Sequence, residues 1–139
     1  MVSKYNFDGI RVDTVPHVKN PFWVEYAEAA GVFSIGEVST GDVGKLAVYS
    51  NHGLDTTLNY PMYYIIRDVF NYKYSMYELK QILESESAKI NDVNALGNFI
   101  DNHDTARFLS VSKSKSLLKA ALTFSFFAPG IPILYYGTE

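Results

Sequence analysis

Cysteine is absent from this chain of 139 residues, which excludes disulfide bonds and metal sites built on cysteine ligands. No apolar run approaches the roughly 20 residues that a membrane-spanning helix needs. The opening segment, MVSKYNFDG, has no apolar stretch of the kind found in signal peptides. Lys and Arg number 12 against 15 Asp and Glu, so the charge gives no indication of binding to nucleic acid or to an anionic membrane surface.

Apolar residues, by contrast, are abundant. They make up 47% of the chain, and aromatic residues make up 15%, which is ample for a core and argues against disorder. We expect most of the aromatic side chains to fill that core, although some could present flat faces to sugar rings. The length suits one domain, and nothing marks a second domain within residues 1–139.

Apolar periodicity predicts strands separated by helices along the whole chain. The expected strands cover 10–13, 32–36, 54–60, 95–100 and 131–136, and the expected helices cover 20–31, 61–70, 76–87 and 115–128, with a loop over 39–51. This rhythm is typical of parallel strands joined by crossover helices, either in an open doubly wound sheet or in a (β/α) barrel.

Acidic residues follow three of these strands and decide between the two architectures. Asp13, Glu37 and Asp104 would all lie at the face where the carboxyl ends of parallel strands meet, which is where barrel enzymes build their active sites. A nucleotide-binding sheet would carry a glycine-rich phosphate loop after a strand, and the sequence has none. We therefore predict a (β/α) barrel.

The segment FDGIRVDTVPH, residues 7–17, places Arg11 and Asp13 on one face of an extended strand. An Arg and an Asp that point into one confined space form a charged pocket. A structural salt bridge at the end of a strand would give the same pattern, so this segment alone leaves both interpretations open.

Clustered carboxylates with an adjacent guanidinium suit glycoside hydrolysis with retention of configuration. Arg11 would lower the pKa of Asp13 and keep it ionised as a nucleophile. Glu37 follows the apolar residues of its strand, and apolar surroundings help a carboxyl group to hold the proton that a donor needs. Asp104, beside His103, would bind sugar hydroxyls and favour the positively charged transition state. A metal site is disfavoured because His17, His52 and His103 show no metal-binding spacing.

Three segments then carry a resemblance to the α-amylases of glycoside hydrolase family thirteen, in particular to fungal-type α-amylases. They are DGIRVDTVPH, GEV and FIDNHD, which are similar to the second, third and fourth signature regions of the family. LDTTLNYPMYY and GIPILYYGTE add to the likeness, which spans nearly the whole chain.

The resemblance implies a role for each matching residue. Asp13 would be the nucleophile, Glu37 the general acid and base, and Asp104 the stabiliser of the transition state. Substrate would be bound by Arg11, His17, Gly41 and His103. The main-chain carbonyl of His17 would also be a calcium ligand, and the other calcium ligands would lie outside the chain. Pro16 stands where many members have Lys, which removes a positively charged donor from the leaving-group side.

The resemblance also implies strands four to eight of an eight-stranded barrel, incomplete at both ends, with open edges and exposed apolar surface. We expect such a fragment to be inactive alone. The full-length protein would be an extracellular, monomeric enzyme that binds calcium and hydrolyses internal α-1,4 bonds of starch-like glucans. An α-glucosidase, a branching enzyme, a transglycosylase or a non-catalytic relative could share the same motifs, whereas a carbohydrate-binding module has no need of three converging acids.

Overall fold

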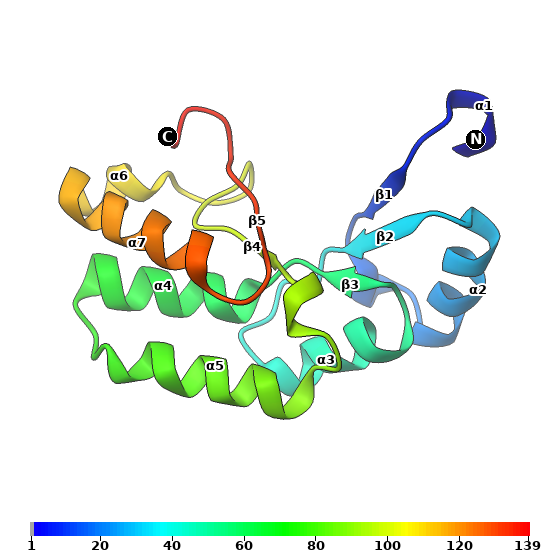
Figure 1. Ribbon diagram of the computed structural model, residues 1–139, viewed down its shortest axis with the longest axis horizontal. Helices are drawn as coiled ribbons and strands as arrows, with labels where there is room; N and C mark the ends of the chain where they lie inside the picture. Colours follow the sequence, from blue (N-terminus) through cyan, green and yellow to red (C-terminus); the bar gives the residue numbers. More distant parts are fainter. Residues whose placement is uncertain (1) are drawn as a thin grey trace.

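The computed structural model describes residues 2–139. Short strands alternate with helices along the chain (Figure 1). In order, the elements are α1 (Val2–Tyr5), β1 (Gly9–Val12), the 3-10 helix η1 (Val15–His17), α2 (Asn20–Ala30), β2 (Phe33–Gly36), α3 (Val43–His52), β3 (Thr56–Thr57), α4 (Tyr60–Tyr72), α5 (Tyr77–Lys89), η2 (Val93–Ala95), β4 (Gly97–Asn98), α6 (Phe108–Ser112), α7 (Lys115–Phe127) and β5 (Ile131–Pro132).

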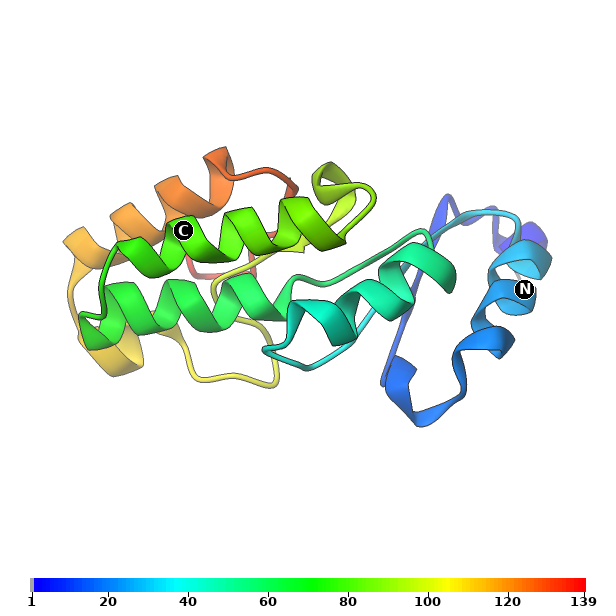
Figure 2. The same cartoon turned by 90° about the horizontal axis from the view of Figure 1, so that it is seen from below.

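All strand pairs are parallel, as predicted. β1, β2 and β3 form one sheet in that order, and β4 pairs with β5 in a second. A parallel bridge between Leu58 and Gly97 joins the two sheets, so the five strands follow one another in space in the order of the sequence. This is the order of consecutive barrel strands, and within residues 2–139 the strands do not close into a barrel. Helix α1 and the C-terminus lie in opposite halves of the molecule along its long axis (Figure 2).

Local signals set the ends of the helices. Pro21 occupies the first turn of α2, and Gly31 ends that helix with a φ of 63°, a left-handed conformation that glycine adopts without strain. The predicted loop over residues 39–51 is wrong, because α3 occupies Val43–His52. The Asp42 side chain starts α3 by accepting hydrogen bonds from the main-chain N–H groups of Gly44 and Lys45.

Three predicted strands are shorter than the sequence suggested. The expected strand over residues 54–60 is reduced to Thr56–Thr57 and the single bridge at Leu58, because Asn59 caps α4 by accepting from the N–H of Met62, so Tyr60 begins a helix. The strands expected over 95–100 and 131–136 are likewise reduced to β4 and β5. The sequence reading also missed the short helices α1 and α6.

The core lies between the strands and the helices that cover one of their faces. Val15, Leu46, Met62, Ile66 and Leu96 are completely buried. Apolar side chains remain exposed near β5, where Phe127 is 86% exposed and Ile131, Ile133 and Leu134 are about four-tenths exposed. Strand β5 therefore presents both unpaired main-chain groups and apolar surface at the open edge of the sheet. Among the described residues, no helix is long and apolar enough to cross a membrane.

Candidate active site

The pairing of β1 with β2 continues past the strands and fixes the main chain of Glu37. The N–H of Glu37 donates to the carbonyl of Val12 at 2.8 Å, and the carbonyl of Glu37 accepts from the N–H of Val15 at 3.0 Å. Glu37 is thus held on both sides by the segment that carries Asp13. This is why two acids 24 positions apart in the sequence lie together at the carboxyl ends of neighbouring strands.

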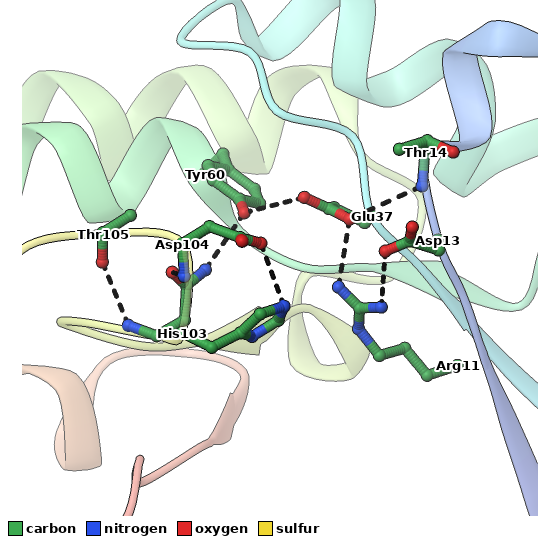
Figure 3. Close-up of polar contacts among 9 residues, drawn as sticks. Arg11, Asp13, Thr14, Glu37, Tyr60, His103, Asp104 and Thr105 are labelled. Atoms are coloured by element: carbon green, nitrogen blue, oxygen red, sulfur yellow. Dashed lines mark hydrogen bonds and ion pairs between the residues drawn. The ribbon is translucent and has the colours of Figure 1, made fainter.

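Arg11 joins these two acids through its guanidinium group. Its Nη1 donates to Oδ1 of Asp13 at 2.7 Å, and its Nη2 donates to Oε2 of Glu37 at 3.0 Å (Figure 3). The hydrogen bond from Arg11 lowers the pKa of Asp13, and the positive charge of the guanidinium acts in the same direction. The predicted contact between Arg11 and Asp13 is present, and the ionised state of Asp13 as a nucleophile stays a prediction.

Donors surround the carboxyl group of Glu37. The residue is 8% exposed, and besides Arg11 its carboxyl group accepts from the Tyr60 hydroxyl at 3.1 Å and from the N–H of Thr14 at 3.5 Å. Burial raises the pKa of Tyr60 to about 12, so this hydroxyl keeps its proton. The expectation of apolar surroundings for Glu37 is therefore wrong at the carboxyl group, because tertiary contacts bring polar groups to it.

The loop after β4 supplies the opposite side of the site. Nε2 of His103 lies 3.0 Å from Oδ2 of Asp104, and both side chains are more than half exposed. Figure 3 shows this pair facing Glu37, Asp13 and Arg11 across the site. Arg11, Asn102 and His103 line one hollow of about 240 Å³. The loop therefore lies opposite the first two acids, as predicted, and the roles of its residues stay predictions.

Two other predicted binding residues lie outside this network. His17 is exposed at the end of η1, and Gly41 lies beside the ring of Tyr64, where an added Cβ would be 3.5 Å from the ring. Sequence reasoning missed Tyr60 and Asn102. Asn102 belongs to the FIDNHD motif, so the sequence places it near the predicted site. Its contact with Tyr60, 42 positions away, does not follow from the sequence.

Among residues 2–139, no group of three or more His, Cys, Asp or Glu side chains is arranged to hold a metal ion. Calcium takes 6–8 oxygen ligands, so the main-chain carbonyl of His17 could supply only one of them. The prediction places the other calcium ligands outside this chain, so calcium binding stays a prediction.

Parallel strands joined by helices, with acids and an arginine at their carboxyl ends, define an enzyme built on a (β/α) barrel. The family description "Alpha amylase, catalytic domain" matches residues 1–139. Alpha-amylase 1 of Lipomyces kononenkoae is 39% identical over 140 residues, which cover the whole of this chain. The chain belongs to the alpha-amylase family, a family of glycoside hydrolases.

Solved structures agree with this assignment. An α-amylase from Malbranchea cinnamomea superposes with a TM-score of 0.94 at 39% identity, over 99% of this chain. An α-amylase from Geobacillus thermoleovorans, solved in complex with acarbose, gives a TM-score of 0.91 at 36% identity, also over 99%. The matched part is 29% and 34% of those two chains and 22% of the Lipomyces enzyme, so the chain spans about a fifth to a third of these relatives.

The fold is shared with a second activity. CldA, a cyclomaltodextrin glucanotransferase, superposes with a TM-score of 0.89 at 29% identity over 99% of this chain. Membership of the family therefore leaves the choice between hydrolysis and glycosyl transfer to the details of the site.

Proposed function

We propose that the protein is a retaining glycoside hydrolase that cleaves internal α-1,4 bonds of starch-like glucans. The observation that carries the proposal is the single guanidinium shared by Asp13 and Glu37. Two carboxyl groups that bind the two ends of one guanidinium are close neighbours. Close carboxyl groups, about 5–5.5 Å apart, belong to the retaining mechanism, whereas inverting enzymes keep them about 6.5–9.5 Å apart to admit a water.

In the first step, a carboxylate oxygen of Asp13 attacks the anomeric carbon while Glu37 gives its proton to the glycosidic oxygen. The bond to the leaving sugar breaks, and a β-linked glycosyl ester forms on Asp13. The lowered pKa of Asp13 supports this role, because only the ionised carboxylate is an effective nucleophile. The proton on Glu37 leaves with the departing sugar, so Glu37 becomes a carboxylate.

In the second step, Glu37 takes a proton from water, and the hydroxide attacks the anomeric carbon. The ester bond to Asp13 breaks, the product keeps its α configuration, and Glu37 regains the proton that it lost. The three donors around Glu37 hold its carboxyl group in place for both proton transfers.

The remaining site residues are proposed to hold the sugar. Asp104 and His103 face the two acids and offer a carboxylate and an imidazole to the hydroxyl groups of the ring that is cleaved (Figure 3). A negative charge at this place favours the positively charged transition state. Arg11 keeps Asp13 in place, while His17 and Gly41 are proposed to contact the leaving-group side.

Glycosyl transfer is the second candidate. The likeness to CldA supports it, because transfer needs only that a sugar hydroxyl replaces water in the second step. Pro16 and the exposed Ser39 lie on the proposed leaving-group side, where an acceptor sugar would bind. The products separate the two candidates, since transfer yields chains longer than the substrate.

Three further parts of the proposal come from the family resemblance. We propose that the protein acts outside the cell, that it is monomeric at its natural length, and that it binds calcium through the carbonyl of His17 together with other ligands. Sedimentation of the secreted protein and its metal content after dialysis test these statements directly.

The deciding experiment compares the protein at its full natural length with an Asp13→Asn variant on soluble starch. We expect α-configured maltooligosaccharides from the unaltered protein, detected by NMR within the first minutes. We expect a loss of many orders of magnitude from the variant, because the covalent route is closed. No cleavage by the unaltered protein, or an unaffected variant, would overturn the proposal.

A further inference from the structure

A chain of hydrogen bonds runs from Glu37 to the loop that carries Asp104. The Tyr60 hydroxyl lies 3.1 Å from Oε1 of Glu37, and Nδ2 of Asn102 donates to the Tyr60 oxygen at 3.0 Å. Oδ1 of Asn102 in turn accepts from the N–H of Asp104 at 3.0 Å. Arg11 already joins Asp13 to Glu37, so one continuous network reaches all three acids.

The direction of each hydrogen bond in this network is fixed. The oxygen of the Asn102 amide accepts from a main-chain N–H, so its nitrogen must face Tyr60. The amide nitrogen can only donate, so the Tyr60 oxygen accepts and its proton is left for Glu37. The pKa of about 12 means that Tyr60 keeps this proton throughout the pH range in which such enzymes work.

Packing holds Tyr60 in one orientation. The residue is 3% exposed, and its ring meets the ring of Phe99 edge-on with centroids 5.0 Å apart. The ring of Tyr63 adds a second edge-on contact at 5.9 Å. Tyr60 also starts α4 directly after the Asn59 cap, so its main chain is fixed as well. A rigid donor of this kind can set the rotation of a partner side chain.

We propose that Tyr60 is a positioning residue for Glu37, and that Asn102 couples this position to the loop of Asp104; the inference rests on the proposed glycoside hydrolase function. Tyr60 fixes Oε1 while Arg11 fixes Oε2, so together they set the plane of the carboxyl group. Without Tyr60 the carboxyl group can turn about its last bond. Proton delivery to the glycosidic oxygen then loses its alignment, although the nucleophile stays in place.

The Tyr60→Phe variant tests this role, because it removes the hydroxyl group and keeps the ring. We would measure kcat/KM at the full natural length on maltoheptaose and on α-maltotriosyl fluoride. Fluoride leaves with little help from a proton donor, so the first step on the fluoride does not depend on the alignment of Glu37. We expect a loss of about ten-fold on maltoheptaose, the size expected for one hydrogen bond to a charged group, and of less than about two-fold on the fluoride.

Tyr63→Phe is the matched control. Tyr63 lies in the same aromatic cluster on α4, is 6% exposed, and its hydroxyl makes no hydrogen bond within residues 2–139. We expect unchanged kcat/KM on both substrates. Melting temperatures of both variants show whether each one folds, and equal melting temperatures make the comparison direct.

Each outcome has a definite meaning. A loss confined to maltoheptaose supports the positioning role. If the unaltered protein cleaves both substrates and Tyr60→Phe loses the two activities equally, or loses neither, the positioning role is overturned and the proposed function stands. If the unaltered protein cleaves neither substrate, the proposed function fails, and the inference that rests on it fails too.

Discussion

Arg11 binds Asp13 and Glu37 at the same time, at 2.7 Å and 3.0 Å, with the two nitrogens at the tips of one planar group. A guanidinium is rigid and always charged, so it fixes both the distance between two carboxylates and the charge that they share. A lysine could neutralise one of them but could not hold both in this geometry. The site therefore depends on the shape of Arg11 as much as on its charge.

Replacing Arg11 should change the pH dependence of the reaction. Arg11 lowers the pKa of Asp13, so without it Asp13 takes up a proton at higher pH, and the acid limb of kcat/KM moves upward in pH. We expect kcat/KM to fall about 100-fold in Arg11→Met and about ten-fold in Arg11→Lys. The lysine keeps the positive charge but cannot bind both carboxylates through one planar group. Profiles between pH 4 and 9 on maltoheptaose check this, and an unmoved acid limb in Arg11→Met would contradict it.

Azide should distinguish the roles of the two acids. In Asp13→Ala, azide can enter the space left on the β face and attack α-maltotriosyl fluoride directly, which gives a β-glycosyl azide. In Glu37→Ala, the glycosyl ester on Asp13 still forms, and azide then releases an α-glycosyl azide. On starch without azide, Glu37→Ala should lose about 10²–10⁴-fold in rate. NMR of the products reads the configuration, and the same anomer from both variants would refute the assignment.

A side chain at Gly97 should cost stability, because apolar side chains from three neighbouring segments crowd this position. A Cβ atom at this position would lie 2.8 Å from Ile133, 2.9 Å from Ile35 and 3.1 Å from Leu58. We expect Gly97→Ala to lower the free energy of unfolding by about 1–3 kcal/mol, measured by urea denaturation.

A second substitution should offset part of the stability that Gly97→Ala loses. The closest atom is Cδ1 of Ile133, which Ile133→Val removes. The double variant should therefore be more stable than the sum of the two single changes predicts. Strict additivity would show that the cost of Gly97→Ala has another origin.

Glu86 should make stability depend on pH. The residue is 2% exposed, its Oε1 has no hydrogen-bond partner among the described residues, and burial raises its pKa from 4.5 to about 7. Because the pKa of Glu86 is raised in the folded state, its contribution to the stability of the fold is complete below about pH 4.5 and is lost as the pH rises to about 7. The free energy of unfolding should change by about 3 kcal/mol over this range.

Glu86→Gln removes this charge and keeps the shape. We expect the stability of the variant relative to the unaltered protein to increase as the pH rises from 4.5 to 7, measured by urea denaturation at each pH. Glu84→Gln, two positions earlier on α5 and exposed beside Lys80, is the matched control and should show no such trend. A constant difference for Glu86→Gln across this range would contradict the prediction.

Local sequence patterns were sufficient where one element alone determines the structure. Alternation placed Arg11 and Asp13 on one face, and Pro21 and Gly31 marked the ends of α2. The same rules failed at Asp42 and Asn59, where a single capping side chain starts a helix inside a segment that looked like a loop or a strand. Short capping signals are weak in a sequence because Asp and Asn are also common in turns.

Contacts between distant elements could not be predicted in this way. The hydrogen bond from Tyr60 to Glu37 joins residues 23 positions apart, and the one from Asn102 to Tyr60 joins residues 42 apart. Neither follows from periodicity, because each depends on how a helix packs against the end of a neighbouring strand. The acids could thus be found in the sequence, while the groups that orient them needed the structure.

The two sides of the site differ in how firmly the chain holds them. The main chain of Glu37 is clamped by hydrogen bonds to Val12 and Val15, so this acid moves only as the sheet moves. His103 and Asp104 stand on an exposed loop five and six residues beyond β4. The site therefore combines a wall held by main-chain hydrogen bonds with an exposed wall, which stands open to each arriving sugar.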